Sequence, residues 1–222
     1  MGTDNTHHKR KAKKASDLAR KKANRDPYEK VLIVCEGEKT EPNYFNKLKD
    51  HLELSSANVM VTGECASSPK SIVDYAIQRY KSEKSTGDSF DKVFCVFDKD
   101  THHTYEDAIN KIRSENPQGV FVSITSVPCF EYWLLLHFLY STKSYESAGK
   151  NSACDNLISE LQNYLPTYQK CDASVFEQIV DQLPRALQYS ERATSEAQRN
   201  GNDNPSTKVH VLVNYLSDIK KK

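Results

Sequence analysis

The stretch VLIVCEGEKTEPNYF, residues 31–45, passes from five apolar residues directly into a charged turn. An apolar run of this length, rich in Val and Ile, predicts a strand that is covered on both faces. Glu36 and Gly37 follow this strand, and Thr40 is an acceptable N-cap for a helix. The order of strand, turn and helix is typical of an α/β fold. A carboxylate at the end of a buried strand then marks either an ordinary polar turn or a functional edge of a sheet.

The alternation of strands and helices continues beyond this stretch. Helical patterns begin at Thr40, at Ser68-Pro69, where proline takes the first helical position, and at Tyr105. The alternation predicts an α/β fold with a mostly parallel, four-stranded sheet and helices on both faces. The four expected strands are Val31–Cys35, Val59–Thr62, Val93–Phe97 and Val120–Ile124.

The second half of the chain is predicted to be helical. Residues 128–140, PCFEYWLLLHFLY, are apolar almost all round, which indicates a buried central helix. A later amphipathic helix should end or kink near Pro184. After a polar loop, a final helix is expected with Asn204 as its cap and Pro205 at its first position.

Charge separates the start of the chain from the rest. Residues 1–30 carry ten Lys or Arg against four acids, although the net charge of the whole chain is only +1. A basic arm over 1–29 would neutralise the phosphates of a polyanion, and the alternative is a solvated, poorly ordered leader. Residues 30–222 are expected to form one domain, with an α/β core at 30–127 and a helical extension at 128–222.

The six cysteines are scattered along the chain, and no C-x-x-C pair or Cys/His spacing suited to zinc is present. Several lie in apolar runs, where a thiol acts as a small hydrophobe. This usage predicts reduced cysteines and a cytoplasmic location. No apolar run reaches the length of a membrane span, so no membrane partner is expected.

Acidic residues follow two of the expected strands. Glu36 ends the first strand, and the sequence FDKD places Asp98 and Asp100 two residues apart after the third. In an open parallel sheet, ligands bind at the carboxyl ends of the strands, where the strand order reverses. If these two strands are neighbours, the three carboxylates converge, and Mg²⁺, or Mn²⁺ in its place, would relieve their mutual repulsion. Such an ion also stabilises charge on a transferring phosphoryl group.

Several blocks of the sequence resemble known protein families. The Glu-Gly after the first strand and the Asp-x-Asp after the third resemble a Toprim domain, the metal-binding catalytic core of topoisomerases, bacterial primases and OLD-type nucleases. More closely, VLIVCEGEKTEPNYF, FDKDTH, SVPCFEYWLLLHF and NPSTKVHVLV resemble the RloB family, which also includes an abortive-infection protein. The blocks extend over nearly all of the chain beyond the basic arm.

The resemblance implies roles for the matched positions. Glu36 would act as general acid/base or as a metal ligand, and Asp98 and Asp100 would hold Mg²⁺. The RloB resemblance adds Glu131, an acid inside an otherwise apolar helix, where burial without a partner is costly. A structural ion pair is the alternative interpretation of Glu131.

Four further residues are candidates for contact with substrate phosphate. Gly37 has no side chain, so a substrate can approach the turn closely. Lys39 and Lys99 lie next to the acids and would neutralise them or touch phosphate. His102 would add a ligand or a proton carrier, although adjacent histidines in a loop are more often exposed to solvent.

The family resemblance implies a Mg²⁺-dependent nuclease that hydrolyses DNA or RNA, tRNA included, as an effector in bacterial anti-phage defence. RloB-like proteins are associated with a separate AAA/ABC-type ATPase, which would restrain or trigger the nuclease. The alternative is a non-catalytic binding module or a toxin-like partner of that ATPase. Other enzyme classes lack their motifs, since the sequence has no G-x-x-x-x-G-K-[ST] loop and no G-x-S-x-G elbow. An oligomer is compatible with this sequence.

Overall fold

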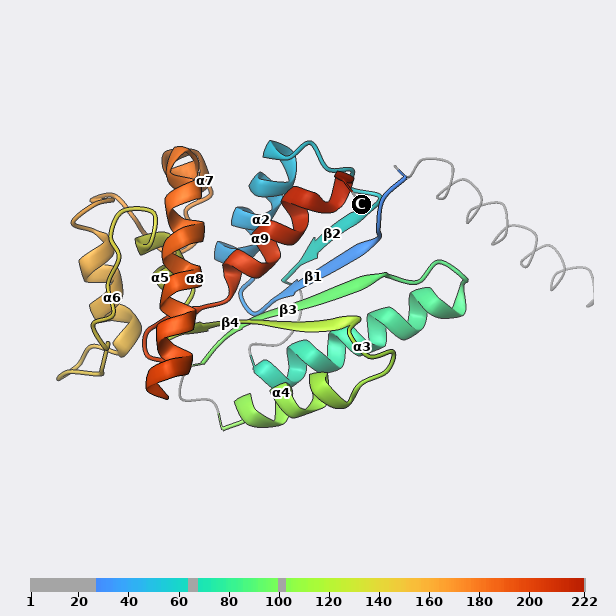
Figure 1. Ribbon diagram of the computed structural model, residues 1–222, viewed down its shortest axis with the longest axis horizontal. Helices are drawn as coiled ribbons and strands as arrows, with labels where there is room; N and C mark the ends of the chain where they lie inside the picture. The colour runs from blue at the N-terminus through green and yellow to red at the C-terminus, as the bar shows by residue number, and fades with distance from the viewer. Residues whose placement is uncertain (1–26, 64–67, 100–102, 222) are drawn as a thin grey trace, which may run out of the picture.

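A five-stranded sheet lies at the centre of the computed structural model, which describes residues 27–63, 68–99 and 103–221 (Figure 1). The strand order is β2-β1-β3-β4-β5, in which β1 to β4 are parallel and β5 is antiparallel to β4. Because β1 has β2 on one side and β3 on the other, the strand order reverses between β1 and β3. The strands are β1 Val31–Cys35, β2 Val59–Thr62, β3 Lys92–Asp98, β4 Phe121–Val127 and β5 Ser206–Thr207.

Helices cover both faces of the sheet. Helices α2 and α9 lie on one face, and α3 and α4 lie on the other (Figure 1). Ser68 caps α3 through a bond from the Ser71 amide, and Pro69 is the first residue of that helix, as its sequence predicts. These helices are α2 Thr40–His51, α3 Pro69–Ser85, α4 Tyr105–Ser114 and α9 Val209–Asp218.

Four helices lie beside the carboxyl ends of the parallel strands, at the left of Figure 1. Their position matters because ligands of open α/β sheets bind at these strand ends. The helices are α5 Glu131–Leu135, α6 Ala153–Leu161, α7 Val175–Ile179 and α8 Leu183–Asn200, with 3₁₀ turns at Val180–Gln182 and Ile219–Lys221.

The alternation of side chains along β3 assigns the residues at its end to opposite faces. Phe94 and Val96 are buried in the core that includes α2 and α9, whereas Val93 and Cys95 are buried in the core that includes α3 and α4. Successive residues of a strand point to opposite faces. Successive side chains at the end of β3 therefore point to two different surfaces of the molecule, one on each face of the sheet.

Several expectations about the second half of the chain are wrong in detail. The sheet has a fifth strand, because Ser206 and Thr207 pair with the end of β4, so the last helix begins at Val209 rather than at Pro205. The buried helix expected over 128–140 is only Glu131–Leu135. The fifth strand arises from tertiary pairing with β4, which the local pattern does not contain.

The region around Pro184 also differs from its expectation. Pro184 lies in the first turn of α8, where a missing N–H is tolerated, so proline begins this helix instead of ending one. The helix continues to Asn200 through residues that were expected to form a polar loop. The division into a core at 30–127 and an extension at 128–222 stays a prediction, and most of the arm at 1–29 lies outside the described residues.

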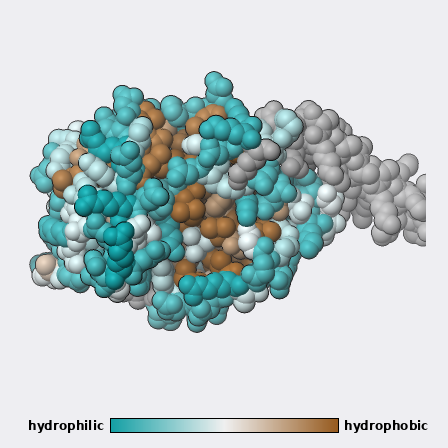
Figure 2. Space-filling view, viewed as in Figure 1, coloured by the Kyte–Doolittle hydropathy of each residue, from teal (hydrophilic) through white to brown (hydrophobic). Residues whose placement is uncertain are grey.

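Apolar side chains reach the surface at the centre of the face shown in Figure 2, and polar side chains surround them. Phe94, Val122, Val211 and Tyr215 line a shallow pocket between α9 and the sheet. Within the described residues, no helix combines the length and the apolar composition that crossing a membrane requires.

Candidate active site

Glu36 and Asp98 meet where the strand order reverses. The amide of Glu36 donates to the carbonyl of Val96 at 3.0 Å, which continues the pairing of β1 with β3 beyond the end of β1. The amide of Asp98 then donates to Oε2 of Glu36 at 2.9 Å. The neighbouring strands thus bring together two acids that are 62 residues apart in the sequence.

Two further acids join this pair from different elements. Glu41 comes from the first turn of α2, and Glu131 is the first residue of α5. Together with Glu36 and Asp98 they line a pocket of about 430 Å³, which we call the acidic pocket. Among the described residues, its charged lining consists of the acids Glu36, Glu38, Glu41, Asp98 and Glu131 and the lysines Lys39 and Lys170.

Two acids of this pocket, Glu41 and Asp98, have raised pKa values. The pKa of Glu41 is raised from 4.5 to about 7, chiefly by burial and in addition by the charges of Glu131 and Glu36. Burial also raises the pKa of Asp98 well above its usual range, with added effects from Glu41, Glu131 and Glu36. Since Glu41 is only 7 % exposed, its charge is poorly solvated. The pocket therefore concentrates negative charge that its own lysines do not offset.

These residues fit a hard divalent cation. Carboxylate oxygens are the ligands that Mg²⁺ prefers, and a cation would favour the ionised forms that burial disfavours. Lys170 is the nearest described ammonium to Glu131, at 3.9 Å from its Oε1, but its side chain is 56 % exposed. A mobile, solvated lysine offsets a buried carboxylate only weakly. Glu36 and Asp98, which the strand ends hold together, are thus described residues with the donor chemistry for such an ion, and Glu41 and Glu131 lie in the same pocket.

Residues 31–216 match the family model of the RloB-like proteins. The chain belongs to this family. Comparison with curated proteins and with solved structures gave no significant match. All the acids of the pocket and both of its lysines lie inside the matched range of this RloB-like protein.

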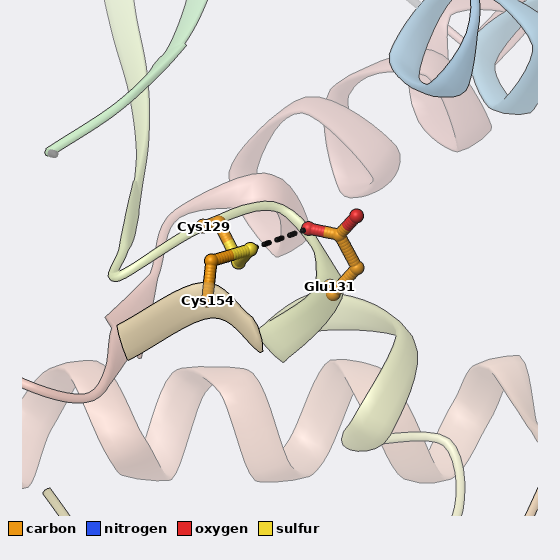
Figure 3. Close-up of side chains that lie close together, drawn as sticks. All are labelled: Cys129, Glu131 and Cys154. Atoms are coloured by element: carbon orange, nitrogen blue, oxygen red, sulfur yellow. Dashed lines mark hydrogen bonds between the residues drawn. A yellow bond between two sulfur atoms is a disulfide. The ribbon is translucent and has the colours of Figure 1, made fainter. Parts of the chain in front are cut away.

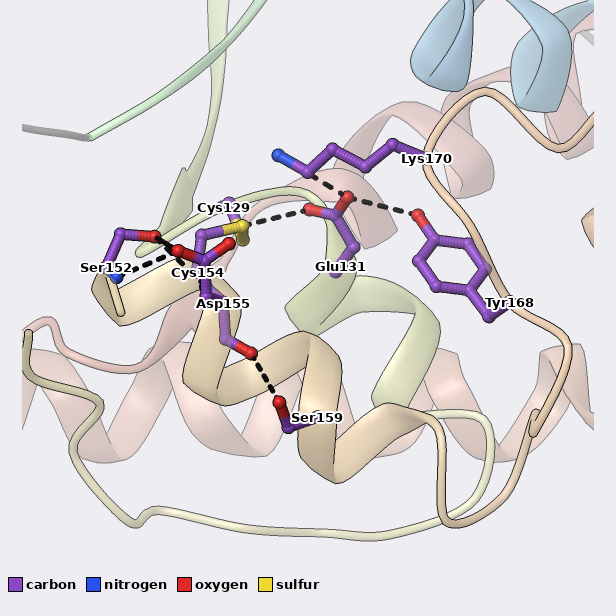
Figure 4. Close-up of a disulfide and its surroundings, with 8 residues drawn as sticks. All are labelled: Cys129, Glu131, Ser152, Cys154, Asp155, Ser159, Tyr168 and Lys170. Carbon is purple, nitrogen blue, oxygen red and sulfur yellow. Dashed lines mark hydrogen bonds and ion pairs between the residues drawn. A yellow bond between two sulfur atoms is a disulfide. The ribbon is translucent and has the colours of Figure 1, made fainter. Parts of the chain in front are cut away.

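Glu131 is held by several partners around its carboxylate. Tyr168 donates its hydroxyl to Oε1 at 3.0 Å, and the sulfur of Cys154 lies 3.4 Å from Oε2 (Figures 3 and 4). Figure 4 shows Lys170 and Tyr168 on the side opposite the cysteines. Glu131 is therefore both buried and hydrogen-bonded, as a structural acid would be, while it also lines the acidic pocket. A role for it in catalysis stays a prediction.

The expectation that all cysteines are reduced is wrong for this structure. Cys129 and Cys154, which are 25 residues apart, form a disulfide beside Glu131 (Figure 3). Sequence spacing did not indicate the pair, because the contact depends on how α6 packs against α5. Ligand atoms of Cys129, Glu131 and Cys154 lie within 4.8 Å of one another. While the sulfurs are bonded to each other, however, only Glu131 offers an anionic ligand there.

The remaining candidate residues lie in different places. Gly37 and Lys39 line the acidic pocket, as expected. Lys99 does not, because its ammonium pairs with Asp203 at 2.6 Å and lines another pocket. Asp100 and His102 lie outside the described residues.

Glu41 is the main residue that the sequence analysis missed. Its signal was available, because Tyr44, Phe45 and Leu48 follow it at helical spacings of three, four and seven and are all fully buried. An acid on the apolar stripe of a helix next to Glu36 is a candidate site residue by that position alone. Tyr168 and Lys170 had no comparable signal, since they lie far along the chain in a turn.

The turn at Gly37 is tightly packed against the end of β2. A Cβ atom on Gly63, which follows β2, would lie 2.1 Å from the carbonyl oxygen of Gly37 and 2.8 Å from Cγ of Pro42. A Cβ on Gly37 itself would lie 2.6 Å from Oε2 of Glu41. The position of Gly63 therefore requires glycine, because its Cβ would meet backbone, whereas at Gly37 the clash is with the end of the Glu41 side chain, which would have to move.

We expect Gly63→Ala to lower the free energy of unfolding by about 1–3 kcal/mol, because the methyl group must displace the Gly37 turn. Urea denaturation measures the change. Gly149→Ala is the control, since a Cβ there meets nothing within 4 Å and only the positive φ of 61° opposes it. Equal losses in the two variants would contradict the packing argument.

The raised pKa values predict how stability depends on pH without metal. Because the pKa of folded Glu41 is about 7 and its ordinary value is 4.5, the folded state binds more protons between these values. The contribution of Glu41 to stability is thus present below pH 4.5 and is lost as the pH rises through 7, on the order of 3 kcal/mol. Melting temperatures in EDTA should show a steeper fall over this range for the wild type than for Glu41→Gln. Parallel pH curves would contradict the assignment.

Proposed function

We propose that this RloB-like protein is a Mg²⁺-dependent nuclease with a Toprim-like core, acting in the cytoplasm as an effector of anti-phage defence. The observation that supports this best is the group of carboxylates that lines an open pocket at the reversal of strand order, two of which, Glu41 and Asp98, have raised pKa values. Mn²⁺ could take the place of Mg²⁺, because the same carboxylate ligands bind both ions. A nearby AAA/ABC-type ATPase is proposed as the partner that controls the enzyme.

The proposed reaction is hydrolysis of a phosphodiester bond in DNA or RNA. A water oxygen bonds to phosphorus, the bond from phosphorus to the leaving sugar oxygen breaks, and that oxygen takes up a proton. Glu36, Asp98 and Asp100 would hold the cation, which when bound would neutralise charge on the phosphoryl oxygens. Glu36 is fixed for this by the Asp98 amide on its Oε2.

Glu41 is the best candidate for proton transfer. Its pKa of about 7 allows the carboxyl both to accept and to donate a proton near neutral pH. Lys39, at the start of α2, and Lys170 line the pocket and would contact the oxygens of the phosphate. Glu131, held by Tyr168, would keep the wall formed by α5 in position.

The experiment that tests this function compares cleavage of single-stranded DNA, double-stranded DNA, tRNA and total RNA. Each substrate is incubated with the full chain in Mg²⁺, Mn²⁺ or EDTA, with and without the partner ATPase. Cleavage that requires metal supports the nuclease and identifies its substrate. If no substrate is cleaved under any condition, and wild type and Glu36→Gln are equally toxic in cells, the nuclease proposal fails and a binding module remains.

A further inference from the structure

A second pocket lies at the same edge of the sheet, next to the acidic pocket. It has a volume of about 300 Å³ and is lined by Lys99, which directly follows β3, and by residues from α4, β4, α8 and the segment around β5. We call it the lysine pocket, after Lys99 and Lys208 in its wall. The wall also carries the hydroxyls of Tyr105 and Thr125 and the amide of Gln198. Lys208 and these polar groups take no part in the proposed reaction.

The two pockets differ in the sign of their charge. Acids outnumber lysines in the described lining of the acidic pocket, whereas the described lining of the lysine pocket carries two lysines and one acid, Asp203. A nucleic acid is a polyanion, so the acidic pocket by itself repels the strand on either side of the scissile bond. Cationic groups next to the acidic pocket would provide the missing attraction.

The sheet holds both lysines in fixed positions. The amide of Lys99 donates to the carbonyl of Ser126 at 2.8 Å, and the amide of Lys208 donates to the carbonyl of Thr125 at 2.9 Å. Two consecutive residues of β4 thus anchor the two lysines from its opposite sides. Lys99 also follows Asp98 directly in the chain, so the two pockets meet at the carboxyl end of β3, one on each face of the sheet.

A carboxylate of the protein occupies the position that a phosphate oxygen would take. Oδ2 of Asp203 lies 2.6 Å from Nζ of Lys99, and the two side chains are 47 % and 36 % exposed. An exposed ion pair of this kind contributes little to stability, so an incoming anion can replace Asp203 at low cost. The hydroxyl and amide groups in the wall are donors for the other oxygens of a phosphate.

We infer that the lysine pocket binds a backbone phosphate of the nucleic-acid strand whose scissile bond lies in the acidic pocket. This inference rests on the proposed nuclease function and assigns to Lys208 the role of a substrate-binding residue. Asp203 acts in the opposite sense, as a carboxylate that competes with the phosphate for Lys99.

Two substitutions with opposite expected effects test the inference. Lys208→Gln should weaken binding about threefold to tenfold and reduce the slope of log affinity against log salt by about 0.7–0.9, because one phosphate contact is lost. Asp203→Asn should tighten binding about threefold, since Lys99 is released for the strand. Binding is measured in EDTA, without cleavage, by the fluorescence anisotropy of labelled single-stranded DNA and RNA of about 16 nucleotides.

The control is a second exposed ion pair with nearly the same geometry. Lys111 and Asp74 are 2.5 Å apart with side-chain exposures of 41 % and 47 %, and they join α4 to α3 outside both pockets. Asp74→Asn makes the same change in net charge as Asp203→Asn, so it reports the effect of charge alone. The inference requires tighter binding by Asp203→Asn than by Asp74→Asn.

The outcomes separate this inference from the proposed function. If the wild type binds and cleaves but Lys208→Gln binds with unchanged affinity and salt slope, the inference is wrong and the nuclease stands. If inorganic phosphate protects the wild type but not Lys208→Gln against heat, while both bind the oligonucleotides equally, the pocket takes free phosphate and the inference is also wrong. If the wild type neither binds nor cleaves any nucleic acid, the proposed function fails and the inference fails with it.

Discussion

Asp98→Asn is expected to reduce metal-dependent cleavage by roughly a thousandfold or more, because a cation ligand contributes several kcal/mol to the transition state. Asparagine keeps the size of the side chain and removes its charge. Asp98 is half-buried at the reversal of strand order, and its backbone amide also fixes Oε2 of Glu36. The substitution should therefore remove a donor to the cation without moving the backbone.

The same variant should be at least as stable as the wild type in EDTA at neutral pH. Burial and the neighbouring acids raise the pKa of Asp98, so its ionisation opposes folding, and a neutral side chain avoids that cost. Thermal unfolding and single-turnover cleavage should thus change in opposite directions. Asp50→Asn is the control, because it removes one exposed acid from α2 outside the pocket. Cleavage by Asp98→Asn within tenfold of Asp50→Asn would contradict the assignment.

Loss of the disulfide should lower the free energy of unfolding by about 3 kcal/mol, because the bond closes a loop of about 25 residues in the unfolded chain. Cys129→Ala/Cys154→Ala removes the bond and avoids an unpaired thiol. The bond also connects the residues before α5 to α6 at the wall of the acidic pocket. Its loss releases Glu131 from one of its neighbours as well as destabilising the chain.

Urea denaturation in oxidising and in reducing buffer measures this effect. The wild type should lose stability on reduction, whereas the double variant should respond to neither buffer. Cys171→Ala is the control, since this cysteine is exposed and unbonded in the structure. Alkylation of the denatured, unreduced wild type should also label two cysteines fewer than alkylation after reduction. Equal stability of the wild type in both buffers, with all six cysteines labelled, would contradict the disulfide.

The family and the parallel sheet were predictable because their signals are local. Each strand from β1 to β4 is a short apolar run between polar turns, and such a run has few alternatives to a buried strand. The same pattern placed Glu36 and Asp98 at strand ends, but only the strand order of the structure shows that the two strands are neighbours. The fifth strand was not predictable, since Ser206 and Thr207 form a strand only because the end of β4 offers them partners.

The sequence by itself determined the α/β alternation, the RloB-like family and two acids of the candidate site, Glu36 and Asp98. Only the tertiary structure decided which groups surround them. Glu41 and Tyr168 reach the site through α2 and the turn after α6, and Lys99 turns away from the acids toward Asp203. The physical reason is that hydrophobic periodicity is encoded over a few residues, whereas contacts between distant segments depend on how whole helices pack and where buried charges find partners.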